Sequence, residues 1–129
     1  MRRRTSLFLF FCFLGCGGCG KKSTDELIRD LNSPLEKDRI TAVRLLPERT
    51  ADAERIVPGL IESLKDKEGD IRWSAAIGLG RVGELAKDAI PALQAAQHDR
   101  DARVREAAGV ALSRIDPAQF PVSSKSKKK

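Results

Sequence analysis

The sequence is poor in the side chains that enzymes most often use for chemistry. Among its 129 residues there is no tyrosine, one histidine, one tryptophan and three cysteines. The histidine, His98, stands beside Asp99 at the end of a predicted helix, where a solvated role is expected. A nucleophile, a general base and a group that orients the base cannot be assembled from this supply. The composition therefore predicts a protein that is not an enzyme and that needs no cofactor.

Cysteine is confined to the N-terminal segment, at Cys12, Cys16 and Cys19. Cys16 and Cys19 spell C-x-x-C, a spacing found in redox pairs and in half of many zinc sites. A structural zinc ion needs four ligands, however, and the chain offers only the distant His98 and no second cysteine pair. We therefore expect neither a metal site nor a redox pair, and the domain that follows must be stable without a disulfide.

The sequence also lacks a hydrophobic run long enough to cross a bilayer. Its N-terminal apolar stretch, Leu7–Leu14, covers only about 12 Å as a helix, against a hydrocarbon layer of roughly 30 Å. A basic segment precedes this stretch, and the run Gly15–Gly20, made of glycine and cysteine, follows it. This order is typical of an export signal. We predict that residues 1–20 are a signal and that residues 21–24 are a linker.

Phe13-Leu14-Gly15-Cys16 resembles the lipobox of bacterial lipoproteins, in which the cysteine is acylated and becomes the mature N-terminus. The resemblance implies a lipid on Cys16, which directly follows the apolar run. Cys19 offers an alternative register, because two small residues precede it. The resemblance further implies a membrane-anchored lipoprotein of the bacterial cell envelope that faces outside the cytoplasm.

Acidic side chains are absent from both ends of the chain, which explains its formal charge of +6. Residues 23–124 hold 15 basic and 18 acidic side chains, so the predicted domain lacks the basic excess of a nucleic-acid-binding protein. The segment 117–129 is predicted to be a disordered basic tail. Two interpretations of this tail stay open: it is a solubilising segment, or it attaches to an anionic surface such as lipid headgroups. Its lysines are Lys125, Lys127, Lys128 and Lys129.

The chain does contain a 33-residue repeat. Four columns of identical residues recur at this spacing: Leu27, Leu60 and Leu93; Arg39, Arg72 and Arg105; Ala42, Ala75 and Ala108; Leu46, Leu79 and Leu112. Such a period is typical of a solenoid, because one unit cannot cover its own apolar face and buries it against the next unit. We predict an all-α fold with a repeat domain over residues 25–116, divided at about 25–51, 52–83 and 84–116.

Each unit is predicted to be a pair of helices. In the second unit, apolar residues at spacings of three and four indicate a helix over residues 53–65 and another over residues 71–82. Pro58 and Pro91 lie within the first helices of units two and three, so these helices should bend or restart there. Gly80 and Gly83 are predicted to end the second helix of unit two.

An aspartate in the turn precedes an arginine of the next helix by six residues, as Asp66 precedes Arg72 and Asp99 precedes Arg105. The carboxylate can cap the following helix, and the arginine can reach the acid of its own unit or of the adjacent unit. Together with Pro58 and small residues after the arginine, this pattern resembles HEAT repeats, most closely the short HEAT-like repeats named after phycobilisome lyases. The resemblance implies an α-solenoid of three two-helix HEAT-like repeats in which the ladder of Asp66, Asp99, Arg72 and Arg105 is structural.

The resemblance also implies a scaffold that binds another protein, although some HEAT-like proteins are bilin lyases or alkylbase glycosylases. Trp73 is the first candidate for a contact residue, because Ile40 and Glu106 occupy the equivalent positions and stacking does not require an aromatic there. The arginines Arg39, Arg72 and Arg105 are expected to complete a patch around it. We therefore predict a lipid-anchored, non-catalytic interaction scaffold. The alternatives are an adaptor subunit of an enzyme complex with an uncleaved N-terminal anchor, and an anionic-polymer binder that acts through the tail.

Overall fold

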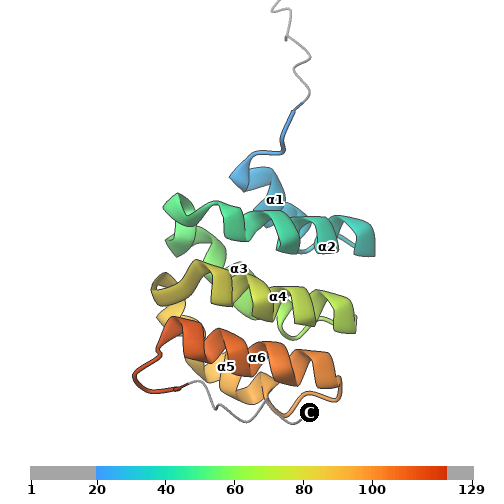
Figure 1. The fold of residues 1–129 in the computed structure, drawn as a ribbon. Coiled ribbons are helices and arrows are strands. Elements are labelled where there is room, and N and C mark those ends of the chain that lie inside the picture. Colours follow the sequence, from blue (N-terminus) through green and yellow to red (C-terminus); the bar gives the residue numbers. More distant parts are fainter. Residues whose placement is uncertain (1–19, 122–129) are drawn as a thin grey trace, which may run out of the picture.

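The computed structural model describes residues 20–121, and all regular structure in this part of the chain is helical. Its α-helices are α1 (Thr24–Asp30), α2 (Glu36–Leu45), α3 (Ala53–Ser63), α4 (Gly69–Val82), α5 (Ile90–Ala96) and α6 (Ala102–Ile115). Three short 3₁₀-helices connect the units, namely η1 (Leu46–Glu48), η2 (Thr50–Asp52) and η3 (Gly83–Ala89). The helices form three successive pairs, α1 with α2, α3 with α4 and α5 with α6 (Figure 1).

The pairs stack in a single direction, so that the second helices form one layer and the first helices form another. Helices α2, α4 and α6 lie one below the other in Figure 1, with α1, α3 and α5 behind them. Helix α4 packs against both α2 and α6, and its contact with α6 is the most extensive between any two elements of the described residues. The predicted fold, an α-solenoid of three two-helix repeats, is confirmed.

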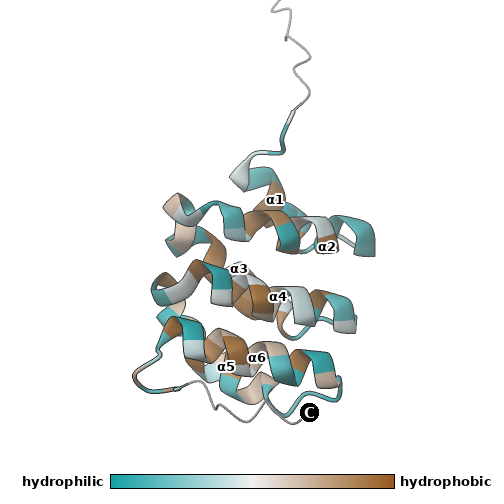
Figure 2. Ribbon diagram, viewed as in Figure 1, coloured by the Kyte–Doolittle hydropathy of each residue, from teal (hydrophilic) through white to brown (hydrophobic). Residues whose placement is uncertain are grey.

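The repeating leucines form the core of the stack. Leu27, Leu60 and Leu93 are completely buried, and each comes from the first helix of its unit. Figure 2 shows that apolar residues are concentrated in the middle of α3 to α6, with polar residues towards the turns. Because each fully buried leucine contributes about 1.5–3 kcal/mol, these positions dominate the stability of the stack. The large side chains that are fully buried are Leu27, Val43, Leu46, Ile56, Leu60, Ile71, Leu79, Leu93, Val104, Leu112 and Ile115.

The two prolines affect their helices differently. Helix α3 continues through Pro58 from Ala53 to Ser63, so the predicted restart does not occur in unit two. Pro91 stands at the start of α5, after the 3₁₀-helix η3, and the predicted restart is found there. Proline fits this first turn because the backbone N–H that it lacks would have no partner within the helix.

The two glycines of α4 also have separate roles. Gly83 follows Val82 with a φ of 68°, a conformation that side chains disfavour, and it ends the helix as predicted. Gly80 stays within α4, so the prediction that it ends the helix is wrong. A Cβ atom at residue 80 would lie 3.0 Å from the Cα atom of Ala111. Gly80 therefore permits the close approach of α4 and α6.

Candidate functional site

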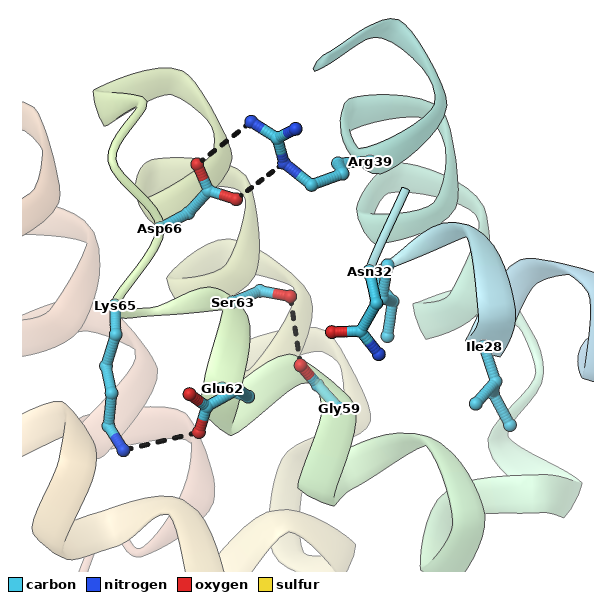
Figure 3. A pocket seen from close by; sticks show the side chains of 9 residues that line it. Ile28, Asn32, Arg39, Gly59, Glu62, Ser63, Lys65 and Asp66 are labelled. Carbon is cyan, nitrogen blue, oxygen red and sulfur yellow. Dashed lines mark hydrogen bonds and ion pairs between the residues drawn. The ribbon is translucent and has the colours of Figure 1, made fainter. Parts of the chain in front are cut away.

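One bidentate ion pair connects each repeat to the next. Arg39 of α2 donates from Nε to Asp66 Oδ2 at 2.8 Å and from Nη2 to Asp66 Oδ1 at 3.3 Å. One unit further along, Arg72 donates to Asp99 in the same way, at 2.8 Å and 3.0 Å. Figure 3 shows the first of these pairs, with the Arg39 guanidinium aimed at the Asp66 carboxylate of the following unit. The arginine thus reaches the acid of the adjacent unit, one of the two arrangements that the sequence allowed.

Further hydrogen bonds fix both partners in each pair. The remaining nitrogen of Arg72, Nη1, donates to the backbone carbonyls of Asp66 and Lys67 at 2.8 Å and 3.1 Å. Asp99 Oδ1 accepts the backbone N–H of Asp101 at 2.8 Å, so the carboxylate also shapes its own turn. The hydrogen bonds from Arg72 lower the pKa of Asp99, with a smaller contribution from the Asp101 N–H. These pairs are therefore built into the stack rather than onto its surface.

A different set of side chains covers the outer surface of α4. Trp73 and Ile77 are half-buried, and Arg81 is exposed at the next position of the same row. Since residues four apart lie one above the other on a helix, the three form a continuous ridge along α4. We call the exposed side of α2, α4 and α6 around this ridge the Trp73 surface.

The ridge is flanked by two shallow hollows, each of about 410 Å³. Trp73 and Ile77 line both of them. Ser74 and Gly78 also line the hollow on the α2 side. The Oγ atom of Ser74 is buried and has no hydrogen-bond partner among residues 20–121.

Arginines surround this apolar ridge. Arg44 and Arg81 line the hollow on the α2 side, and Arg103 and Arg114 line the hollow on the α6 side. Arg103 pairs with Asp70 at 2.9 Å, and Arg81 lies 3.7 Å from Glu48. In the part of the chain that the structure describes, no carboxylate lies within 4.0 Å of Arg44 or Arg114. An aromatic and aliphatic centre with arginine at its edge is the composition of many protein-binding surfaces.

The model of the family described as HEAT repeats matches residues 24–113, which is more than half of the chain. The chain belongs to the HEAT-repeat family. HEAT repeats commonly mediate interactions between proteins and are usually non-catalytic scaffolds. No curated protein matches this sequence.

Within the HEAT array, the predicted contact residues do not form one patch. Arg39 and Arg72 were candidates for partner contacts, but their side chains are only 9% and 7% exposed and their donors are occupied. The prediction that they join Trp73 in a patch is wrong. Consecutive helix residues point in different directions, so Arg72 faces the turn of the next unit while Trp73 faces outward. Arg105, the third member of the column, is exposed.

The neighbours that Trp73 does have were not predicted from the sequence. They are Ile77 and Val110 in the apolar part of the surface and Arg44, Arg81 and Arg114 around it. A usable signal was present, because positions four and eight residues after Trp73 share its helix face and neither holds the same residue in all three repeats.

Several residues singled out from the sequence lie outside the Trp73 surface or outside the described residues. Cys16, Cys19 and the four tail lysines lie outside residues 20–121. Within the described range, no group of three His, Cys, Asp or Glu side chains is placed to hold a metal ion. His98 is exposed at the end of α5. No helix of residues 20–121 has the length and hydrophobicity required to cross a membrane.

Proposed function

We propose that this chain is a non-catalytic scaffold that binds another protein through the Trp73 surface, built from short HEAT-like repeats of the phycobilisome-lyase type. The observation that carries the proposal is the ridge of Trp73 and Ile77 between two hollows. A large aromatic side chain at the centre of such a surface is the kind of residue that contributes most to binding energy. The array needs no aromatic at this place, since Ile40 and Glu106 hold the equivalent positions in the other repeats.

Two further features support a partner at this surface. The two hollows beside the ridge leave room for side chains of a partner. Arg44 and Arg114 provide charge at the edge of the surface. The partner therefore carries apolar side chains at its centre and acidic side chains around them.

Capture from envelope membranes tests this function. Wild type, Trp73→Ala and a control variant, Leu85→Ala, serve as baits; Leu85 is 63% exposed in η3 and lies outside both hollows. Wild type and the control should recover the same partner, whereas Trp73→Ala should lose it, because central aromatic residues contribute about 2 kcal/mol or more. Equal recovery by wild type and Trp73→Ala would remove Trp73 from the site and contradict the proposal.

We also propose that a lipid on Cys16 tethers the protein in the bacterial cell envelope, facing outside the cytoplasm. The sequence supports this through the apolar run Leu7–Leu14 and the lipobox-like residues that end at Cys16. Palmitate should label wild type and not Cys16→Ser, with Cys19→Ser as the matched control. Loss of the label only in Cys19→Ser would move the lipid to the other register. An unlabelled wild type would favour an adaptor with an uncleaved anchor.

A further inference from the structure

Arg105 is the third member of the arginine column, and it differs from the other two in having no carboxylate partner among residues 20–121. Arg39 binds Asp66 and Arg72 binds Asp99, in each case across the boundary to the next repeat. Beyond Arg105 the described chain has no further repeat. The salt bridges of residues 20–121 include none that involves Arg105.

The Arg105 guanidinium is nevertheless held by the same kind of backbone hydrogen bonds as those of Arg39 and Arg72. Its Nη1 donates to the backbone carbonyls of Asp99 and Arg100 at 2.8 Å and 3.2 Å. Arg72 Nη1 makes the equivalent bonds at 2.8 Å and 3.1 Å. The edge formed by Nε and Nη2, which binds a carboxylate in units one and two, is therefore fixed in place before any ligand arrives. Pre-organisation of this kind lowers the entropic cost of forming a bidentate pair.

The surroundings of Arg105 leave room for a ligand. Arg105 borders a hollow of about 480 Å³ that Gln97, Gly109 and Phe120 also line. A Cβ atom at residue 109 would meet no atom closer than Gln97 Nε2 at 3.7 Å, so the backbone of α6 is approachable there. Glu106 lines the same hollow, which disfavours a ligand that is only an anion. A peptide segment that supplies both a carboxylate and hydrogen-bond donors fits better.

We propose that Arg105 is a carboxylate-binding site in the last described repeat, occupied by an aspartate or glutamate in a turn of a different protein. This contact is separate from the Trp73 surface and goes beyond the function proposed above. A second copy of the chain, stacked in register, is a poor occupant. Its first repeat has Ser33 in the column of Asp66 and Asp99, and a hydroxyl cannot accept a bidentate, charge-assisted pair.

A peptide titration of the full chain in detergent tests the site. The probe is a peptide with the sequence of residues 64–72, which contains the turn acid Asp66, and its control carries Asp66→Asn while keeping Glu68 and Asp70. The Nε–H signal of Arg105 in a ¹⁵N-labelled sample should move with the first peptide. The control peptide should bind with an affinity lower by about tenfold or more, because a charged hydrogen-bond partner is lost. An Arg105 signal that does not move, or equal binding of both peptides, overturns the proposal.

Variants of the protein show whether Arg105 itself binds the peptide. Anisotropy of a fluorescein-labelled probe should show weaker binding to Arg105→Lys, which keeps the charge and loses the planar fork. Arg114→Gln, which removes an exposed arginine of the same helix outside the Arg105 hollow, should bind as wild type does. The same loss in both variants would mean general charge attraction and would overturn the site. Trp73→Ala should leave the titration unchanged, so a failed titration and a failed partner capture can be told apart.

Discussion

At the scale of single residues, the buried arginines and aspartates explain why the array has a fixed register. Each Arg–Asp pair joins residues 27 positions apart, in consecutive repeats, and both partners are also bonded to backbone groups. The sequence predicted the ladder but not its direction. The choice between an arginine's own unit and the next depends on how far one hairpin is displaced along its neighbour, and local spacing does not contain that information.

Removing one partner of a buried pair should cost much more than removing one partner of an exposed pair. In Arg72–Asp99 the side chains are only 7% and 12% exposed, whereas those of Arg103 and Asp70 are both 59% exposed. Asp99→Asn should lower the free energy of unfolding by about 3 kcal/mol, because Arg72 stays buried without its counter-charge. Asp70→Asn should cost about 0–1 kcal/mol. Urea unfolding measures both, and equal losses would contradict a structural role for the ladder.

The same pair should make stability depend on acid. Arg72 lowers the pKa of Asp99 in the folded protein, so ionised Asp99 stabilises the fold above the pKa of the unfolded chain. That stabilisation is lost as the pH falls below about 4 and through the lower folded pKa. The difference in unfolding free energy between wild type and Asp99→Asn should therefore shrink from pH 7 to pH 2. A difference that stays constant over this range would contradict the role assigned to the carboxylate.

At the scale of helices, α4 is the element that connects the array. It packs against α2 on one side and α6 on the other, and small residues let both neighbours approach. In the sequence, small residues after the arginine are part of the pattern that resembles HEAT repeats. The sequence predicted helices over residues 53–65 and 71–82, with a bend or restart at Pro58 and a stop at Gly80 and Gly83. Helix α3 does not restart at Pro58 and Gly80 stays within α4, because packing of the neighbouring helices outweighs the local preference of a single proline or glycine.

Two glycine-to-alanine changes separate packing from helix propensity. A Cβ atom at residue 78 would lie 2.6 Å from Cγ of Pro47, a rigid ring, so Gly78→Ala should destabilise the protein by about 1–3 kcal/mol. Gly109 has open space, and Ala76 holds the equivalent position in unit two. Gly109→Ala should stabilise by about 0.5–1 kcal/mol. Thermal unfolding followed by circular dichroism checks both. A stabilising Gly78→Ala would show that η1 and α4 are not packed this closely.

At the scale of the whole molecule, three repeats are expected to unfold as one unit. Every repeat buries its leucines against a neighbour, and α4 shares contacts with both ends. Trp73 is the only tryptophan, so its fluorescence reports on the middle repeat while circular dichroism reports on all helices. The two urea transitions should coincide. An end repeat that unfolds at lower urea than Trp73 would show that the array is not cooperative.

The shape of the array also explains which residues of the Trp73 surface can be predicted from the sequence. Repetition revealed the stack and marked Trp73 as an exception to it. The neighbours Arg44, Val110 and Arg114 belong to α2 and α6, which are distant in sequence from Trp73, so they emerge only when the hairpins are placed side by side. Contact residues on a solenoid are those that do not repeat, so the 33-residue period does not identify them.

Solution footprinting of the captured complex shows whether the partner covers the Trp73 surface. Side-chain labelling of Trp73, Ile77 and Val110 should fall when the partner is bound, while labelling of Leu85 on η3 should not change. Protection confined to the side formed by α1, α3 and α5, with Trp73 labelled as strongly as in the free protein, would exclude the Trp73 surface as the binding site.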